Sequence, residues 1–460
     1  MRRYLSLLFL FCFYTLSYGQ GQRNYAQELF NLLMNGRYFE AKEFKVQHRD
    51  QLQPDIDLVY NMYMASAFNK PDSTIYYLEK FLGDPRGVRT IGPVVGQYYV
   101  GLYETYANKQ QFDKAISTVE RYINYLKENP YSLDPEAIKK EIVGAQGNIT
   151  LFKEKINTAS IIRIAHGEKD YKIKLKNDPN IRFDALYNGH NIETYFDKGT
   201  SDFCIMEKEL ADEIGVKYKQ TQDSTRLMYG KLIRAIGGYI DSIELGGLKL
   251  YNIPVVVFLD KFASYLPGHL DPGVRQDLQN NLLKSKQVLF GLPAIRKIGG
   301  RFEFDWKSNT LIIRQSKDPK NIASNLNPNM AFINNSLYLH LKVNDTDFTG
   351  FLDLSADHYV FLTYPYFFKS NSDYVNNDAK KQPYTRVGFL GIEENIERYR
   401  VENPKIYFGG KMIDAKNAQS EVYTVADINN FDGEVGVRFF KNNFSKTVID
   451  FNTMTIQCEE

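Results

Sequence analysis

Residues 186–206, LYNGHNIETYFDKGTSDFCIM, and residues 343–362, VNDTDFTGFLDLSADHYVFL, decide the fold because they repeat one pattern. In the first copy Asn188 precedes Asp197 by nine residues, and in the second an asparagine precedes Asp353 by the same nine. Short β-branched and aromatic runs broken by Asn, Asp and Gly are typical of strands and tight turns. Each copy therefore predicts a β-hairpin whose second strand ends at the aspartate.

The repetition continues downstream in LFGLPAIRKIGGRFEFDWKSNTLII and EVGVRFFKNNFSKTVIDFNTMTIQC. Gly291 lies fourteen residues before Asp305, and Gly436 lies fourteen residues before Asp450. Each copy thus predicts a loop and a helix, then a strand that ends in glycine, then a final hairpin. Asp305 and Asp450 each precede a polar turn, so we expect them to cap hairpins at the surface. Two similar β-rich halves follow from this duplication.

This duplicated plan resembles the retropepsin and pepsin clan of aspartic peptidases. In that family each half supplies an Asp-Thr-Gly or Asp-Ser-Gly loop, beside which a later strand ends in apolar-apolar-Gly. The resemblance covers about residues 165 to 460. It implies an all-β, two-lobed, pepsin-like (retropepsin-like) acid protease fold with lobes at residues 161–315 and 316–460. It also implies hydrolysis of peptide bonds in an extended polypeptide substrate, without a cofactor or a metal.

The resemblance implies that Asp197 and Asp353 form the catalytic pair. Two adjacent carboxylates share one proton, so one can take a proton from the attacking water while the other donates to the scissile carbonyl. A flap over the substrate is expected in the segment STRLMYGKLIRAIGGYIDSIEL, with Tyr229 and Gly230 at its tip. The residues implied to support the catalytic loops are Lys198, Gly199, Thr200, Leu354, Ser355, Ala356, Gly291 and Gly436.

Two positions depart from the family pattern. Thr or Ser follows each aspartate in the family, but Lys198 and Leu354 stand there in this chain. An ammonium within about 4 to 6 Å of the pair would favour ionisation of both carboxylates and remove the proton that the acid must donate. Two interpretations stay open: an aspartic endopeptidase, and a catalytically inert pepsin-like module that binds extended peptides or a protein partner.

The chain before this β-rich part has a helical pattern over residues 20–160. Three stretches, FNLLMNGRYFEAKEF, YMASAFNKPDSTIYYLEKFL and YETYANKQQFDKAISTVERYI, each predict a helix, a short polar turn and a second helix. The turns centre on Gly36, Lys70 and Lys109. This pattern resembles tetratricopeptide-like repeats, which stack to bury their apolar faces. Such a domain is expected to offer a surface to a protein partner, to cover the β-rich part as a propeptide, or to act as a spacer.

The first nineteen residues predict a signal peptide, because Arg2 and Arg3 precede the apolar run LSLLFLFCFYTL. The run is too short to span a bilayer, so we expect export to the periplasm or the outside and no membrane span.

The remaining cysteines, Cys204 and Cys458, could form a disulfide or be two buried thiols. With 57 basic and 55 acidic residues, the chain carries no field that would attract nucleic acid.

Overall fold

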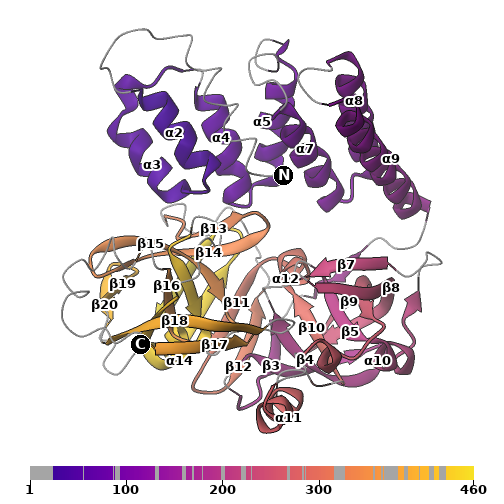
Figure 1. Cartoon of the computed structure of the whole chain (residues 1–460), viewed down its shortest axis with the longest axis vertical. Helices are drawn as coiled ribbons and strands as arrows, with labels where there is room; N and C mark the ends of the chain where they lie inside the picture. Colours follow the sequence, from indigo (N-terminus) through magenta and orange to yellow (C-terminus); the bar gives the residue numbers. More distant parts are fainter. Residues whose placement is uncertain are drawn as a thin grey trace. The chain divides into compact units, whose positions relative to one another are not determined.

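The protein is described by a computed structural model that divides into two compact units, Met1–Ile161 and Ile162–Glu460 (Figure 1). The predicted signal peptide lies outside the described residues. The structure describes residues 24–54, 56–85, 88, 94–129, 134–157, 162–167, 170–178, 180–197, 202–218, 224–228, 231–266, 270–281, 284, 286–314, 327–355, 358–363, 366, 382–387, 392–402, 405–413, 419–423 and 431–460.

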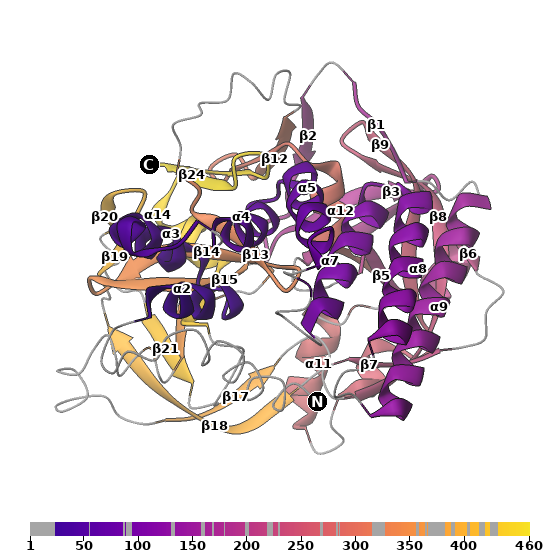
Figure 2. The ribbon, with the colours of Figure 1, turned by 90° about the horizontal axis from the view of Figure 1, so that it is seen from above.

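The first unit is built from helices that pack in consecutive pairs. Helices α7, α8 and α9 lie side by side in Figure 2, and their buried faces share one apolar cluster. The helices are α2 (Tyr25–Met34), α3 (Tyr38–Gln47), α4 (Ile56–Ala67), α5 (Pro71–Leu82), α7 (Val95–Asn108), α8 (Phe112–Glu128) and α9 (Pro135–Asn157), with a short 3₁₀ turn at Arg49–Gln51. Among the described residues, no helix is long and apolar enough to cross a membrane.

Three helix pairs are joined by the same turn. Gly36, Asn69 and Gln110 have positive φ angles of 71°, 53° and 59°. The next residue in each case donates its N–H to the carbonyl five residues earlier, at 2.8 to 2.9 Å, which closes the preceding helix as a Schellman turn does. The three predicted helix pairs are therefore present, but the second and third turns centre on Asn69 and Gln110 and not on Lys70 and Lys109.

The first half of the second unit contains a closed ring of six strands. In ring order these are β9, β5, β10, β4, β3 and β8, and β8 pairs with β9 to close the ring. The elements of this half are β1 (Arg163–Ala165), β2 (Tyr171–Lys174), β3 (Arg182–Tyr187), β4 (His190–Asp197), β5 (Cys204–Glu207), α10 (Lys208–Glu213), β6 (Lys217–Tyr218), β7 (Ser224–Met228), β8 (Lys231–Leu245), β9 (Leu248–Phe258), η3 (Phe262–Tyr265), α11 (Pro272–Asn281), β10 (Gln287–Gly291), α12 (Leu292–Ile298), β11 (Arg301–Asp305) and β12 (Thr310–Arg314).

The second half repeats the pairing of the first. The β14–β15 hairpin, the parallel β15–β22 pair and the antiparallel β16–β22 pair correspond to β3–β4, β4–β10 and β5–β10. The elements of this half are β13 (Met330–Ile333), β14 (Ser336–Val343), β15 (Thr346–Asp353), β16 (Val360–Thr363), β17 (Gln382–Val387), β18 (Ile392–Glu402), β19 (Ile406–Phe408), β20 (Lys411–Ile413), β21 (Gln419–Tyr423), β22 (Gly433–Gly436), α14 (Val437–Asn443), β23 (Lys446–Asp450) and β24 (Thr455–Glu459).

One five-stranded sheet, in the order β2-β12-β11-β23-β24, joins the two halves. Its central pair, β11 and β23, is antiparallel, and Glu303 lies opposite Val448. Both residues stand twelve positions after the strand-ending glycine of their own copy, Gly291 or Gly436. A strand that pairs with its own counterpart, centred on the equivalent residue, relates the two halves by a near-twofold axis.

The repeated asparagines, Asn188 and Asn344, adopt the same backbone conformation and make the same kind of hydrogen bond in both halves. Asn188 and Asn344 have φ angles of 48° and 49°, in the left-handed region that Asn tolerates in tight turns. The Oδ1 atom of Asn188 accepts a hydrogen bond from the N–H of Ser242 at 2.9 Å, and that of Asn344 accepts one from Lys405 at 3.0 Å. Asn188 therefore ties its hairpin to strand β8, and Asn344 ties its hairpin to the residue just before β19, so the match between copies is structural.

Asp305 and Asp450 cap their hairpins as predicted. Asp305 accepts a hydrogen bond from the N–H of Ser308 at 2.9 Å, and Asp450 accepts one from Asn452 at 2.8 Å. The expectation that both lie at the surface is wrong for Asp450, which is buried. The turn after Asp450 contains the buried side chains Phe451 and Met454, whereas Lys307 and Ser308 in the turn after Asp305 are exposed.

Candidate active site

Asp197 and Asp353 end corresponding strands of the two halves. Gly291 on β10 lies opposite Asp197 on β4, and Gly436 on β22 lies opposite Asp353 on β15, in parallel pairs of the same register. A Cβ atom at Gly436 would lie 2.3 Å from the carbonyl oxygen of His358, so the close approach of backbones requires glycine there. The strands that the sequence predicts beside the two aspartates are therefore in place.

The two carboxylates meet at one hydroxyl group. The Oγ atom of Ser355 lies 2.5 Å from Oδ1 of Asp353 and 3.4 Å from Oδ1 of Asp197. The N–H of Ser355 also donates to Oδ1 of Asp353, at 2.9 Å. Two oxygens within hydrogen-bonding reach of one hydroxyl lie no more than about 6 Å apart. Two aspartates separated by 156 positions, each on its own half, are thus brought to the same hydroxyl group.

Leu354 supports its loop by apolar packing. Its side chain is 1% exposed and lies in a cluster drawn from both halves, including Phe196 and Phe302 from the first and Leu337 and Ile449 from the second. Full burial of a leucine contributes about 1.5 to 3 kcal/mol to folding. The hydroxyl that the family places after the second aspartate is therefore replaced here by a contact that also holds the halves together. Of the other predicted loop residues, Lys198, Gly199, Thr200 and Ala356 lie outside the described residues.

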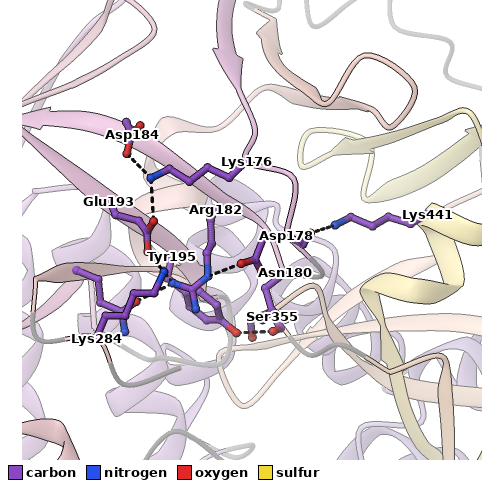
Figure 3. Close-up of polar contacts among 11 residues, drawn as sticks. Lys176, Asp178, Asn180, Arg182, Asp184, Glu193, Tyr195, Lys284, Ser355 and Lys441 are labelled. Carbon is purple, nitrogen blue, oxygen red and sulfur yellow. Dashed lines mark hydrogen bonds and ion pairs between the residues drawn. The ribbon is translucent and has the colours of Figure 1, made fainter. Parts of the chain in front are cut away.

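Tyr195 is a site residue that the sequence analysis missed. It is buried on β4, and its hydroxyl donates to the carbonyl oxygen of Ser355 in the other half, at 2.5 Å (Figure 3). Burial raises the pKa of Tyr195 well above its usual value, and the nearby charges of Asp197 and Asp353 raise it further. One signal was available in the sequence, because alternate residues of a strand point to the same face and Tyr195 stands two positions before Asp197.

A buried charged cluster lies behind Tyr195. The guanidinium of Arg182, which is 1% exposed, lies 4.6 Å from the centre of the Tyr195 ring. Its Nη1 atom donates to Glu193 at 3.0 Å and to Gln287 at 2.9 Å, and its Nε atom lies 3.5 Å from a carboxylate oxygen of Asp178 (Figure 3). Because a buried guanidinium is stable only when it is paired, these partners hold Arg182 against the tyrosine ring.

Glu193 completes this cluster as its main anion. Burial opposes its ionisation, but hydrogen bonds from Lys176 and Lys284 outweigh burial and lower the pKa of Glu193 to about 2. Both ammonium groups lie 2.8 to 2.9 Å from its carboxylate oxygens. The carboxylate is therefore charged at neutral pH, as the buried Arg182 requires.

The predicted flap segment forms a hairpin. Met228 at the end of β7 pairs with Lys231 at the start of β8. The predicted tip, Tyr229 and Gly230, lies between these strands and outside the described residues. The second half has a hairpin in the corresponding place, β17–β18, which the sequence analysis did not predict.

Several other features bear on the chemistry of this unit. Cys204 is buried and Cys458 is half-buried, and both are free thiols, so the possible disulfide between them is not formed. Helix α11 begins directly after Asp271, whose side chain accepts a hydrogen bond from the N–H of Gly273 at 2.8 Å. Within the described part of the chain, no group of three or more His, Cys, Asp or Glu residues is arranged to hold a metal ion.

Comparisons with known proteins give one family match and one similar solved structure. No curated protein is similar in sequence to this chain. Among solved structures, a retropepsin-like aspartic protease from Rickettsia conorii is 21% identical, with a TM-score of 0.21, and the match covers 33% of this chain and 92% of that one. Residues 183–283, which include Asp197 and the β7–β8 hairpin, match the aspartyl protease family model and support an aspartic protease domain in the second unit.

Proposed function

We propose that the second unit is an aspartic endopeptidase in which Asp197 and Asp353 are the catalytic pair. One observation carries this proposal: equivalent aspartates of two duplicated halves end parallel strand pairs of the same register and reach the same hydroxyl group. The family match over residues 183–283 supports the same activity for the first half.

The proposed mechanism uses the two carboxylates in different protonation states. Because the two carboxylates reach the same hydroxyl group, ionisation of one disfavours ionisation of the other, and the proposed pair shares one proton during catalysis. The ionised member takes a proton from water as its oxygen attacks the scissile carbonyl carbon, and the protonated member donates to the carbonyl oxygen. The tetrahedral intermediate then breaks its C–N bond as a proton is returned to the amine. No covalent bond to the enzyme is formed in these steps.

The proposed substrate is an extended stretch of polypeptide. A peptide in the extended conformation can add its main-chain hydrogen bonds to the hairpins β7–β8 and β17–β18 if these cover it from the two sides. The predicted signal peptide supports a location in the periplasm or outside the cell. The first residue of the mature protein tests this location, and Gln20 is the expected one.

The inert peptide-binding module stays as a second candidate because of Ser355. Its hydroxyl lies 2.5 Å from one carboxylate and 3.4 Å from the other, so it competes for the oxygens that would hold the attacking water. If the water cannot displace this hydroxyl, the pair binds a peptide carbonyl without hydrolysing it. Lys198, beside Asp197 in the sequence, favours the same outcome if its ammonium faces the pair.

Digestion of an unfolded protein mixture by the purified mature chain, from acid to neutral pH, decides between these functions. We expect cleavage that Asp197→Asn and Asp353→Asn each abolish and that a pepstatin-type inhibitor blocks. Asp305→Asn is the matched control, since this aspartate is also repeated but caps a hairpin, and an amide oxygen can accept the same hydrogen bond. Cleavage by Asp197→Asn would refute the pair, whereas peptide binding without cleavage by the natural chain would establish the inert module.

We further propose that the helical unit stacks tetratricopeptide-like repeats and offers a surface to a protein partner. The three equivalent turns at Gly36, Asn69 and Gln110 support a repeated unit. A protease site inserted at residues 158–161 separates this role from that of a propeptide. Cutting there should leave the peptidase rate unchanged if the helices bind a partner, and should raise the rate if they cover the site.

A further inference from the structure

The contact between Tyr195 and Ser355 joins the two halves directly at the candidate active site. Tyr195 lies on β4 of the first half, two residues before Asp197, and its side chain is 5% exposed. Its hydroxyl donates to the carbonyl oxygen of Ser355, a residue of the second half that follows Asp353 by two positions, at 2.5 Å. Each partner thus belongs to the same segment as one of the two aspartates.

Ser355 acts on both carboxylates from this held position. Its N–H and its hydroxyl both converge on Oδ1 of Asp353, at 2.9 and 2.5 Å, and the hydroxyl lies 3.4 Å from Oδ1 of Asp197. A hydroxyl carries one proton and two lone pairs, so it can donate to the ionised aspartate and accept from the protonated one. Donation to a carboxylate favours its charged form and lowers its pKa.

Tyr195 cannot easily turn away from Ser355. The Arg182 guanidinium lies over the face of its ring, 4.6 Å from the ring centre (Figure 3). Arg182 is itself held by Glu193 and Gln287. Lys441 of α14 in the second half donates to the backbone carbonyl of Asp178 at 2.8 Å, close to the same arginine. The ring is therefore supported by a network that also spans the two halves.

We propose that Tyr195 and Ser355 form a latch between the halves that positions the two aspartates and sets their ionisation. Tyr195 fixes the backbone of Ser355, and Ser355 in turn fixes Asp353 and shares its hydroxyl with Asp197. Both are positioning residues, because they act through the aspartates. The latch takes over the cross-link for which Lys198 and Leu354 offer no hydroxyl. Its effect on turnover rests on the proposed peptidase function, but its effect on ionisation does not.

The first test is a titration of the aspartate carboxyl groups by NMR, with ¹³C in the aspartate side chains and Asp197→Asn and Asp353→Asn used for assignment. Ser355→Ala should raise the lower apparent pKa of the pair by about one unit, since a hydrogen bond to a charged group favours ionisation by roughly that amount. Ser355→Thr keeps a hydroxyl at this position and should restore the natural titration. An unchanged titration in Ser355→Ala would overturn the latch.

Tyr195→Phe removes the other side of the latch. This variant should also raise the lower apparent pKa of the aspartate pair, but by less than Ser355→Ala does. Tyr187→Phe is the matched control, because Tyr187 is a fully buried tyrosine on the adjacent strand whose hydroxyl bonds to Thr194 within the first half, at 2.9 Å. The control should leave the titration unchanged. An equal shift in both variants would mean a general loss of structure and would also overturn the latch.

Steady-state kinetics of peptide cleavage test the effect of the latch on turnover, which depends on the proposed peptidase function. In a chain that cleaves peptides, Ser355→Ala and Tyr195→Phe should lower kcat about tenfold with KM within about twofold, and should move the acid limb of the pH profile upward. A natural chain without cleavage, together with the predicted titration shifts, refutes the peptidase and keeps the latch. Should Tyr195→Phe fail to fold, the Ser355→Ala and Ser355→Thr pair decides the matter alone.

Discussion

Replacing Leu354 with threonine should damage this protein, although it restores the residue type that the family has after its aspartate. The leucine is 1% exposed and packs between aromatic and aliphatic side chains of both halves. Threonine loses apolar volume, which costs about 1 to 2 kcal/mol at about 0.8 kcal/mol for each buried methylene-sized group. Its hydroxyl would be buried in an apolar cluster, which adds about 1 to 3 kcal/mol unless it finds a partner. We therefore expect a loss of about 2 to 5 kcal/mol.

The chain offers a well-placed probe for this measurement. Trp306 is the single tryptophan of the sequence, and it lies in the second unit, where its N–H groups bond to Ser445 and Thr447 of the other half. Urea unfolding followed by tryptophan fluorescence therefore reports on the junction between the halves and not on the helical unit. The change in midpoint multiplied by the m-value gives the loss of free energy.

Leu354→Met is the matched control, since it conserves volume and polarity and should cost less than about 1.5 kcal/mol. If Leu354→Thr proves as stable as the natural chain, the apolar support assigned to Leu354 is refuted. A gain in peptidase activity by Leu354→Thr would further mean that a hydroxyl at this position reaches the aspartates, contrary to its place in the apolar cluster.

Three further predictions concern a buried ion pair, a glycine and the two cysteines. Because the pKa of Glu193 is lowered to about 2, its charged carboxylate should stabilise the fold above the unfolded pKa, and this contribution should be lost as pH falls from about 5 to 2. In urea unfolding, Glu193→Gln should therefore lose less stability in acid than the natural chain does. Gly436→Ala should prevent folding because its Cβ would lie 2.3 Å from a carbonyl oxygen, whereas Gly144→Ala, at a helix position with open space, should raise Tm slightly. A soluble Gly436→Ala protein with the circular dichroism spectrum of the natural chain would contradict this. Burial raises the pKa of the Cys204 thiol and raises that of the Cys458 thiol to about 12. A maleimide at pH 8 should therefore label neither cysteine in the native protein and both cysteines in urea. Rapid labelling of Cys204 in the native protein would disprove its burial.

The duplicated pattern in the sequence was enough to predict the strands beside the site. Tight turns need particular residues, so Asn188 and Asn344 mark corresponding hairpins, and the strands that end at Asp197 and Asp353 follow from their positions. The helix pairs of the first unit were predictable for the same kind of reason, because apolar residues at helical spacing are a local signal. The flap hairpin of the first half was also expected from the order of elements, but its counterpart β17–β18 was not.

What surrounds the two aspartates was decided by the tertiary structure alone. Leu354 breaks the family motif in the sequence, yet the fold gives it an apolar cluster from both halves. Ser355 was expected in the second loop, but its contact with Tyr195, which lies 160 positions away, was not predicted. Sequence patterns report on neighbours along a strand or a helix, whereas side-chain partners across two halves depend on how the halves pack. The sequence could therefore nominate the two aspartates and their loops, but it could not predict which contacts across the halves hold them.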